Sequence, residues 1–207
     1  MNAYTEQPQV IEYFAKELSW LSFNERVLQE AKDKNNPIIE RIRFLGIFSN
    51  NLDEFFRVRV ADVKRRILLN KLPNANFEED EALLSQIQKK VLQLGKKFNL
   101  IHQQILNDLT AHNIHVDRPE ELTEFHLNWL KNYFHDNVLQ HISPILLDEN
   151  KDYSDYINDT MTYLFVEMSD EKSHFAMLEV PTDRVSRFII LPPEKTRRHK
   201  TIVMLDD

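Results

Sequence analysis

The chain of 207 residues is long enough for one large domain or two small ones, and its 42% hydrophobic residues favour a folded protein over a disordered one. A net charge of −7 argues against a dedicated nucleic-acid-binding protein, and the absence of cysteine excludes disulfides and thiolate metal sites. With only two glycines, Gly46 and Gly95, the sequence contains neither glycine-rich phosphate-binding motif and is expected to be rich in helix.

Two targeting features are also missing from the sequence. There is no apolar run of about 18 residues, so we expect no transmembrane helix. The first residues lack a basic region followed by an apolar region, so we expect no secretory signal. The cytoplasm is therefore the expected location.

The stretch 17–34 predicts a first helix of about 15 residues, because apolar side chains recur on one face. A second helix is predicted to follow from Asn36 as its N-cap and Pro37 at its first position. Its apolar positions keep a spacing of three and four with two skipped turns: Ile38, Ile42, Leu45, Leu52, Phe56, Val63 and Ile67. Residues 57–63 alternate as a strand would, but the longer helical period includes them, so helix is the prediction.

The third segment has the clearest pattern and predicts one long helix over residues 79–112. The apolar positions form an unbroken heptad seam: Leu84, Ile87, Val91, Leu94, Phe98, Ile101, Ile105 and Leu109. Three helices with short connections predict an antiparallel three-helix bundle for residues 1–112.

After residue 112 the pattern changes to short strands and one further helix. Residues 112–122 predict a short strand and a turn, and residues 121–142 predict a helix capped by Thr123. Strand-like runs follow at 160–168, 174–180 and 187–191, and the chain ends in another apolar run. We expect residues 113–207 to be a truncated domain of mixed α/β structure.

Two adjacent asparagines, Asn50 and Asn51, interrupt the apolar second helix. The simpler interpretation is a helix kink, or amides that bond to a neighbouring helix. The sharper interpretation uses Phe48 and Phe55, which lie three residues before and four residues after Asn51 on one helical face. An amide between two aromatic rings suits a planar base, and asparagine can donate to and accept from adenine at once.

Histidines and basic clusters carry weaker signals. His112 and His115 lie three residues apart but on either side of a predicted helix end, so no metal site and no catalytic triad is assigned. The clusters KRR (64–66) and KTRRHK (195–200) are most simply solvated surface, and a polyanion site is the alternative, because arginine binds phosphate in a bidentate manner.

Four stretches resemble the N-terminal part of the bacterial polyphosphate kinases that synthesise long polyphosphate chains. They are ELSWLSFNERVLQEA (17–31), NPIIERIRFLGIFSNNLDEFFRVRVADVKRR (36–66), NWLKNYFHDNVLQHISPILLDE (128–149) and EVPTDRVSRFIILPPEKTRRHK (179–200). The resemblance covers almost the whole chain after the first ten residues.

The resemblance implies a larger enzyme. It implies a helical domain that covers the adenine of ATP, a head domain that contributes to a homo-oligomer, and two C-terminal domains of the phospholipase D type. The family moves the terminal phosphate of ATP reversibly to polyphosphate, through a phosphohistidine and with magnesium. The phosphohistidine and most phosphate ligands lie in the C-terminal domains, so the chain is expected to contribute no catalytic residue and no metal ligand, and to be inactive alone.

Within this chain the resemblance assigns two sets of residues. Asn51 matches the adenine contact, and Arg197, Arg198 and Lys200 are candidates for lining the polyphosphate path. ATP, ADP and polyphosphate are the expected ligands, with no nucleic acid, in the cytoplasm or at the periphery of the inner membrane. The alternative class is a non-enzymatic helical scaffold that recruits a partner through its heptad faces.

Overall fold

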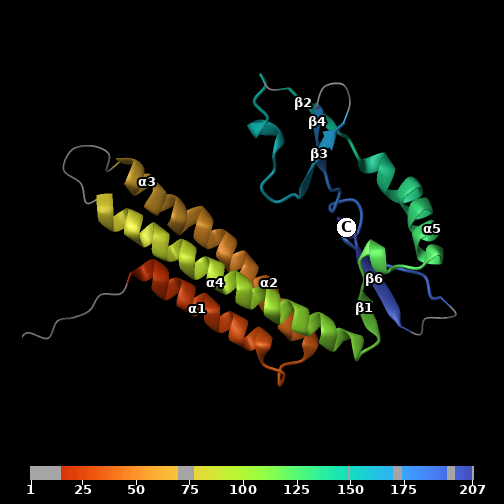
Figure 1. The fold of residues 1–207 in the computed structure, drawn as a ribbon, viewed down its shortest axis with the longest axis horizontal. Helices are drawn as coiled ribbons and strands as arrows, with labels where there is room; N and C mark the ends of the chain where they lie inside the picture. The colour runs from red at the N-terminus through yellow and green to blue at the C-terminus, as the bar shows by residue number, and fades with distance from the viewer. Residues whose placement is uncertain (1–14, 70–76, 149, 170–173, 195–198, 207) are drawn as a thin grey trace, which may run out of the picture. The chain divides into compact units, whose positions relative to one another are not determined.

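The computed structural model describes residues 15–69, 77–148, 150–169, 174–194 and 199–206 (Figure 1). The chain divides into two compact units, residues 1–108 and 109–207. The first unit is helical, and the second contains short strands, helical turns and one longer helix. The predicted order of a helical part followed by a mixed part is therefore confirmed in outline.

The helical unit contains α1 (Lys16–Lys32), α2 (Ile38–Glu54), α3 (Ala61–Leu69) and α4 (Phe77–Thr110). α4 confirms the long helix predicted from the heptad seam, which is buried at Ile87, Leu94 and Ile101. Side chains from all four helices and from the segment that joins α2 to α3 form one core. Its most deeply buried members are Leu21, Leu28, Ala31, Phe48, Phe55, Val63, Ile87, Leu94 and Ile105.

The second predicted helix is not a single regular α-helix. A π-helical segment, Phe55–Val60, joins α2 to α3. A π-helical turn takes up extra residues, so it resets which side chains face the core. Phe55 and Val60 are buried, whereas Phe56 is 41% exposed. The prediction that Phe56 faces the core was therefore wrong, because the apolar spacing alone does not reveal the change of helical period.

The start of α2 also differs from the prediction. Pro37 is the N-cap and Ile38 the first helical residue, and no side chain caps this end. The Asn36 side chain instead donates a hydrogen bond of 2.9 Å to the carbonyl oxygen of Glu30, near the end of α1. Asn36 thus satisfies a carbonyl at the end of the preceding helix, which is a need that the sequence pattern does not show.

The second unit contains two three-stranded sheets among its described residues. One sheet has the order β1-β6-β5, with β1 (Ile114–Val116) parallel to β6 (Lys200–Met204) and β5 (Phe188–Ile190) antiparallel to β6. The other sheet has the order β2-β4-β3 and is antiparallel throughout. Its strands are β2 (Ile145–Leu147), β3 (Tyr163–Met168) and β4 (His174–Glu179).

The predicted strands after residue 160 are confirmed as β3, β4 and β5, and the sequence analysis did not predict β2. The helix predicted over 121–142 is regular only in α5 (Glu124–Tyr133), and π-helical and 3-10 turns follow to His141. Thr123 caps α5 as expected, accepting a hydrogen bond from the backbone N–H of His126. Trp129, Leu130 and Tyr133 of α5 pack on the β1-β6-β5 sheet.

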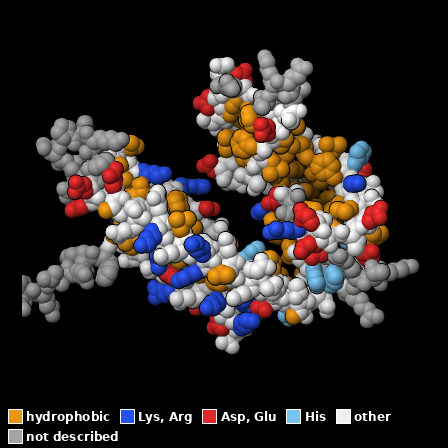
Figure 2. All heavy atoms as spheres, viewed as in Figure 1, with side chains coloured by type: hydrophobic (Ala, Val, Ile, Leu, Met, Phe, Trp, Pro, Cys, Tyr) orange, Lys and Arg blue, Asp and Glu red, His pale blue; other side chains and the backbone are white. Residues whose placement is uncertain are grey.

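Large apolar side chains remain exposed on the strands of this unit (Figure 2). Phe165 on the edge strand β3 is 67% exposed, and Phe175 on β4 is 47% exposed. The pairing of Phe165 with Met177 puts Phe165 and Phe175 on the same face of the sheet. A contiguous apolar patch and an open edge both favour association with another chain.

We therefore predict that the 207-residue chain self-associates through this sheet. Phe165→Glu should shift the chain toward the monomer in sedimentation equilibrium, because a charge on the patch opposes its burial. Leu92→Glu, at an equally exposed leucine on α4, is the control and should leave the association unchanged. A wild-type chain that stays monomeric at all concentrations would contradict the prediction.

Candidate functional site

Asn51 lies in the last turn of α2, immediately before the π-helical segment. Its side chain is half-buried, whereas that of Asn50 is exposed. The two amides point to different sides because successive residues of an α-helix are turned by about 100°. The second asparagine is therefore held at the edge of the core, and the first is in solvent.

A short chain of amide hydrogen bonds holds Asn51 in place. Asn51 Nδ2 donates to Oδ1 of Asn24 on α1 over 3.1 Å, and Asn24 Nδ2 donates to the carbonyl oxygen of Phe48 over 3.1 Å. Asn24 is fully buried, so these two bonds satisfy an amide that would otherwise cost about 1–3 kcal/mol. Asn24 thereby fixes the orientation of the Asn51 amide.

The remaining hydrogen-bonding capacity of Asn51 matches an adenine edge. No hydrogen bond to its Oδ1 occurs within the described part of the chain, and Nδ2 carries a second hydrogen. One acceptor and one donor side by side are what the amino group and a ring nitrogen of adenine require. The simpler interpretation of Asn51, an amide bonded to a neighbouring helix, is also part of the structure, since one hydrogen goes to Asn24.

The aromatic part of the sequence argument for Asn51 was wrong. Phe48 and Phe55 are both buried in the core, 2% and 1% exposed, and cannot flank a base. Phe48 stacks on Phe98 of α4, and Phe55 stacks on Trp20 of α1, with ring centroids 4.8 Å apart in the second pair. The sequence spacing correctly placed Phe48 and Phe55 on one side of the helix. This side packs on α1 and α4 and does not face a ligand.

The basic cluster at 64–66 is largely neutralised. Arg65 pairs with Asp62 over 2.8 Å, and Arg66 pairs with Asp62 over 2.7 Å and with Asp80 over 2.9 Å. Arg65 and Arg59 line a surface hollow of about 380 Å³ together with Val58, Ala61 and Asp62. Sequence analysis did not single out Arg59, because its side of the helix is set by the π-helical segment.

The other basic candidates are mostly outside the described residues. Arg197 and Arg198 lie in the stretch 195–198, which is outside the described residues. Lys200 is the first residue of β6 and its side chain is exposed, while its backbone N–H donates to the carbonyl oxygen of Asn113 over 2.8 Å. The position of Lys200 is compatible with a phosphate contact, and its role stays a prediction.

A carboxylate next to Asn24 links α1 to α4. Glu25 contacts both Lys90 and Lys97, and the hydrogen bond from Lys90, followed by that from Lys97, holds the pKa of Glu25 below its ordinary value. At the C-terminal end of α4, the hydrogen bond from buried Arg41 lowers the pKa of Asp108 in the same way. Both carboxylates are more acidic in the folded than in the unfolded chain.

We therefore predict that the helical unit loses stability in acid. A lowered folded-state pKa stabilises the folded chain at pH values above the unfolded pKa, ordinarily 4.5 for Glu25 and 3.8 for Asp108, and this stabilisation is lost as the pH falls through the folded value. Urea unfolding between about pH 6 and about pH 3 should show the loss, and Glu25→Gln should flatten it. The same slope in Glu25→Gln and wild type would contradict the assignment to Glu25.

The buried histidine of the second unit has a structural role. His126 on α5 is 1% exposed, and its Nε2 lies 3.1 Å from the carbonyl oxygen of Pro192. This bond and the 3.0 Å hydrogen bond from the Thr123 hydroxyl to Glu194 tie the start of α5 to the segment after β5. His126 thus helps to hold the start of α5 in place through Nε2, while its buried Nδ1 has no hydrogen-bond partner among the described residues.

The fold and the site together define a protein with a helical unit, in which Asn24 orients the half-buried amide of Asn51, and a small mixed-sheet unit. Residues 13–116 match the family description "Polyphosphate kinase N-terminal domain", and residues 126–207 match "Polyphosphate kinase middle domain". The chain therefore belongs to the polyphosphate kinase family. No helix within the described ranges is long and apolar enough to span a membrane.

Individual relatives agree with this assignment. The polyphosphate kinase of Vibrio cholerae serotype O1 is 48% identical over 196 residues, and that of Escherichia coli K12 is 45% identical over 196 residues. In both cases the match covers 94% of this chain and 28% of the relative. The crystal structure of polyphosphate kinase from Porphyromonas gingivalis superposes with a TM-score of 0.75 at 34% identity, over 93% of this chain and 29% of that one.

Proposed function

We propose that this chain is the N-terminal part of an enzyme that reversibly transfers the terminal phosphate of ATP to polyphosphate. The observation that carries the proposal is the match of two consecutive polyphosphate kinase domains, at 45–48% identity to relatives that bear this name. The chain spans a little over a quarter of those relatives. The catalytic residues and the magnesium ligands therefore belong, in this proposal, to C-terminal domains of the phospholipase D type.

The helical unit would act on the nucleotide. Residues 1–112 would form an antiparallel three-helix bundle, with α2 and α3 as its second member, that covers adenine. Asn51 would donate to a ring nitrogen and accept from the amino group, and Asn24 would hold its amide in the required orientation. This division is supported by the oxygen of Asn51, which accepts no hydrogen bond from the described residues, and by the position of Asn51 at the edge of the core.

The second unit would serve assembly and the phosphate path. Residues 113–207, the first part of the head domain, would contribute a dimerisation surface, which the exposed apolar strands support. The enzyme would work in the cytoplasm or at the periphery of the inner membrane, with ATP, ADP and polyphosphate as its ligands and no nucleic acid.

The proposed function is tested by measuring polyphosphate formation from ATP and magnesium. The full-length protein that carries this sequence should form polyphosphate and become labelled by ATP that is radioactive in its terminal phosphate. The 207-residue chain should do neither, because it lacks the phosphohistidine. Absence of polyphosphate formation by the full-length protein, or a labelled histidine in the chain alone, would overturn the proposal.

The basic cluster near the start of β6 gives a separate prediction. Reversing the charge of Arg197, Arg198 and Lys200 in the full-length enzyme should weaken polyphosphate binding, because each lysine or arginine that contacts phosphate contributes electrostatic attraction. The loss should be greatest at low salt. Charge reversal at Lys89 and Lys96, on α4, is the control and should leave polyphosphate binding unchanged. Equal polyphosphate binding by the triple variant and wild type would contradict the prediction, and the cluster would then be ordinary solvated surface.

A further inference from the structure

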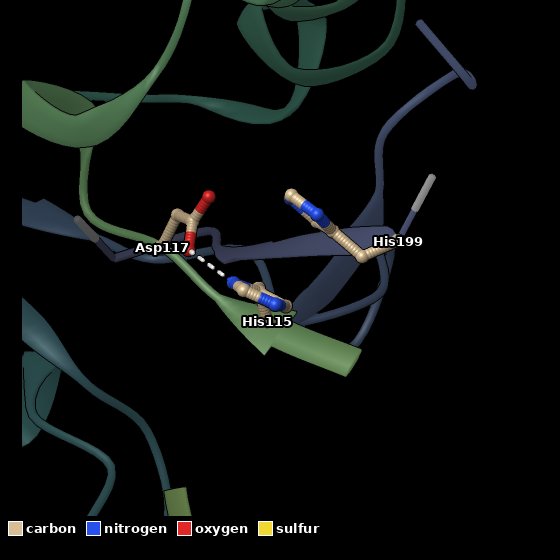
Figure 3. Close-up of side chains that lie close together, drawn as sticks. All are labelled: His115, Asp117 and His199. Carbon is tan, nitrogen blue, oxygen red and sulfur yellow. Dashed lines mark ion pairs between the residues drawn. The ribbon is translucent and has the colours of Figure 1, made fainter. Parts of the chain in front are cut away.

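Three side chains with metal-binding atoms meet at the junction of β1 and β6 (Figure 3). His115 lies on β1, Asp117 follows the end of that strand, and His199 precedes β6. One ligand atom from each lies within 4.8 Å of the other two, and all three residues are partly buried. This cluster is separate from Asn51, which belongs to the other unit.

The backbone places these side chains on one face of the sheet. In the parallel pair, His115 lies opposite Thr201, so His199, two residues earlier, shares the side of the sheet that His115 and Asp117 occupy. Two backbone hydrogen bonds fix the junction: Lys200 N–H to Asn113 O over 2.8 Å, and Asp117 N–H to Ile202 O over 3.0 Å. The turn from α4 into β1 is made by Asn113, whose φ is 58°, a conformation that asparagine adopts more readily than most residues.

The geometry of the side chains is close to that of a metal site. The rings of His115 and His199 stack with centroids 3.8 Å apart, and His115 Nδ1 lies 3.9 Å from Asp117 Oδ1. Metal–ligand bonds of about 2.0–2.2 Å put neighbouring ligands of a tetrahedral zinc ion roughly 3.3–3.6 Å apart. The rings are only 19° from parallel, so one of them must turn about its side-chain bonds to direct a nitrogen at the ion. His115 is about one-third exposed, which leaves room for this turn.

The chemistry of the three ligands selects the type of ion. Two imidazoles and one carboxylate suit zinc and neighbouring divalent transition metals. Magnesium prefers oxygen ligands and retains its waters, so this set does not fit the magnesium of a phosphate-transfer reaction. No local pattern in the sequence reveals the cluster, because His115 and His199 are brought together only by the pairing of two strands that are far apart in the chain.

We propose that His115, Asp117 and His199 bind one divalent transition-metal ion of the zinc type. The ion links β1 to β6, and water completes its coordination. Since the folded chain brings the ligands together and the unfolded chain does not, binding stabilises the second unit. The site is independent of the proposed phosphate transfer.

The test is a zinc titration of the 207-residue chain, prepared without a histidine tag and freed of metal. Calorimetry should give one saturable equivalent, and thermal unfolding should move to higher temperature with added zinc and return with chelator. Cobalt(II) should give visible absorption bands of a low-coordinate nitrogen–oxygen site. Magnesium should produce none of these effects.

Substitutions identify the ligands. His115→Ala, Asp117→Asn and His199→Ala should each weaken zinc binding at least about tenfold, because even loss of a residue that only orients a ligand costs about 10–100-fold. His112→Ala, an exposed histidine one residue before Asn113, is the matched control and should bind as wild type does. Circular dichroism of each variant without metal checks that its fold is retained.

Two outcomes would overturn the proposal. One is the absence of saturable zinc binding by the wild-type chain, and the other is equal binding by wild type, His115→Ala and His199→Ala. Neither outcome touches the proposed function, because polyphosphate formation is measured with magnesium and on the full-length protein.

Discussion

Replacing Phe55 with alanine is expected to lower the free energy of unfolding of the helical unit by about 3–5 kcal/mol. The ring is 1% exposed, stacks on Trp20 and belongs to the core that all four helices share. Its removal takes away apolar burial and leaves a cavity that the surrounding helices fill only in part. Urea unfolding of the 207-residue chain, followed by far-UV circular dichroism, measures the change.

Phe56 is the matched control for Phe55, because it is the next residue in the same π-helical segment and is 41% exposed. Phe56→Ala should cost about 1 kcal/mol or less, as most substitutions outside the core do. An uninterrupted α-helical spacing, as predicted from the sequence, gives the reverse order of effects. A larger loss in Phe56→Ala than in Phe55→Ala would therefore contradict the π-helical segment.

The sequence predicted those parts of the fold in which a local pattern and the tertiary structure agree. The heptad seam of α4 extends over many turns, so its period determines both the helix and its buried face. The strand-like runs that became β3 and β4 were six residues long in the fold, and residues 169–173 between them suited a hairpin loop in the sequence. Thr123 was identified as a cap because its hydroxyl acts on the backbone three residues away.

Other features depend on contacts that no local pattern contains. The three residues of β2 are too few to show a period, and the strand exists because β4 pairs with it. The site was predicted only in part. The family resemblance proposed Asn51 as an adenine contact, which stays a prediction, whereas its hydrogen-bond partner Asn24 is on another helix and needed the structure to be found. The resemblance assigned no role to His199, and the strand pairing that brings it to His115 is not local.

The second large effect is expected at the amide pair that Asn24 and Asn51 form. Asn51→Ala removes the hydrogen bond to Asn24 and leaves a buried oxygen atom without a partner. The free energy of unfolding should fall by about 1–3 kcal/mol. In the full-length enzyme the same change removes the proposed bonds to adenine, worth on the order of 1 kcal/mol net, so the KM for ATP should rise about fivefold.

Asn50 is the control for both effects. Its side chain is exposed, so Asn50→Ala should change the free energy of unfolding by no more than about 0.5 kcal/mol and leave the KM for ATP unchanged. A stability loss in Asn50→Ala equal to that in Asn51→Ala would contradict the burial of the second amide.

The proposed adenine contact is tested most directly by steady-state kinetics of Asn51→Ala in the full-length enzyme, well below its unfolding temperature. An adenine contact made equally in the ground state and the transition state raises the KM and spares kcat. We therefore predict a KM for ATP about fivefold higher with an almost unchanged kcat, and no change in Asn50→Ala. A KM unchanged in Asn51→Ala, in a variant that shows the expected loss of stability, would contradict the account. The amide pair would then serve only to hold α1 against α2.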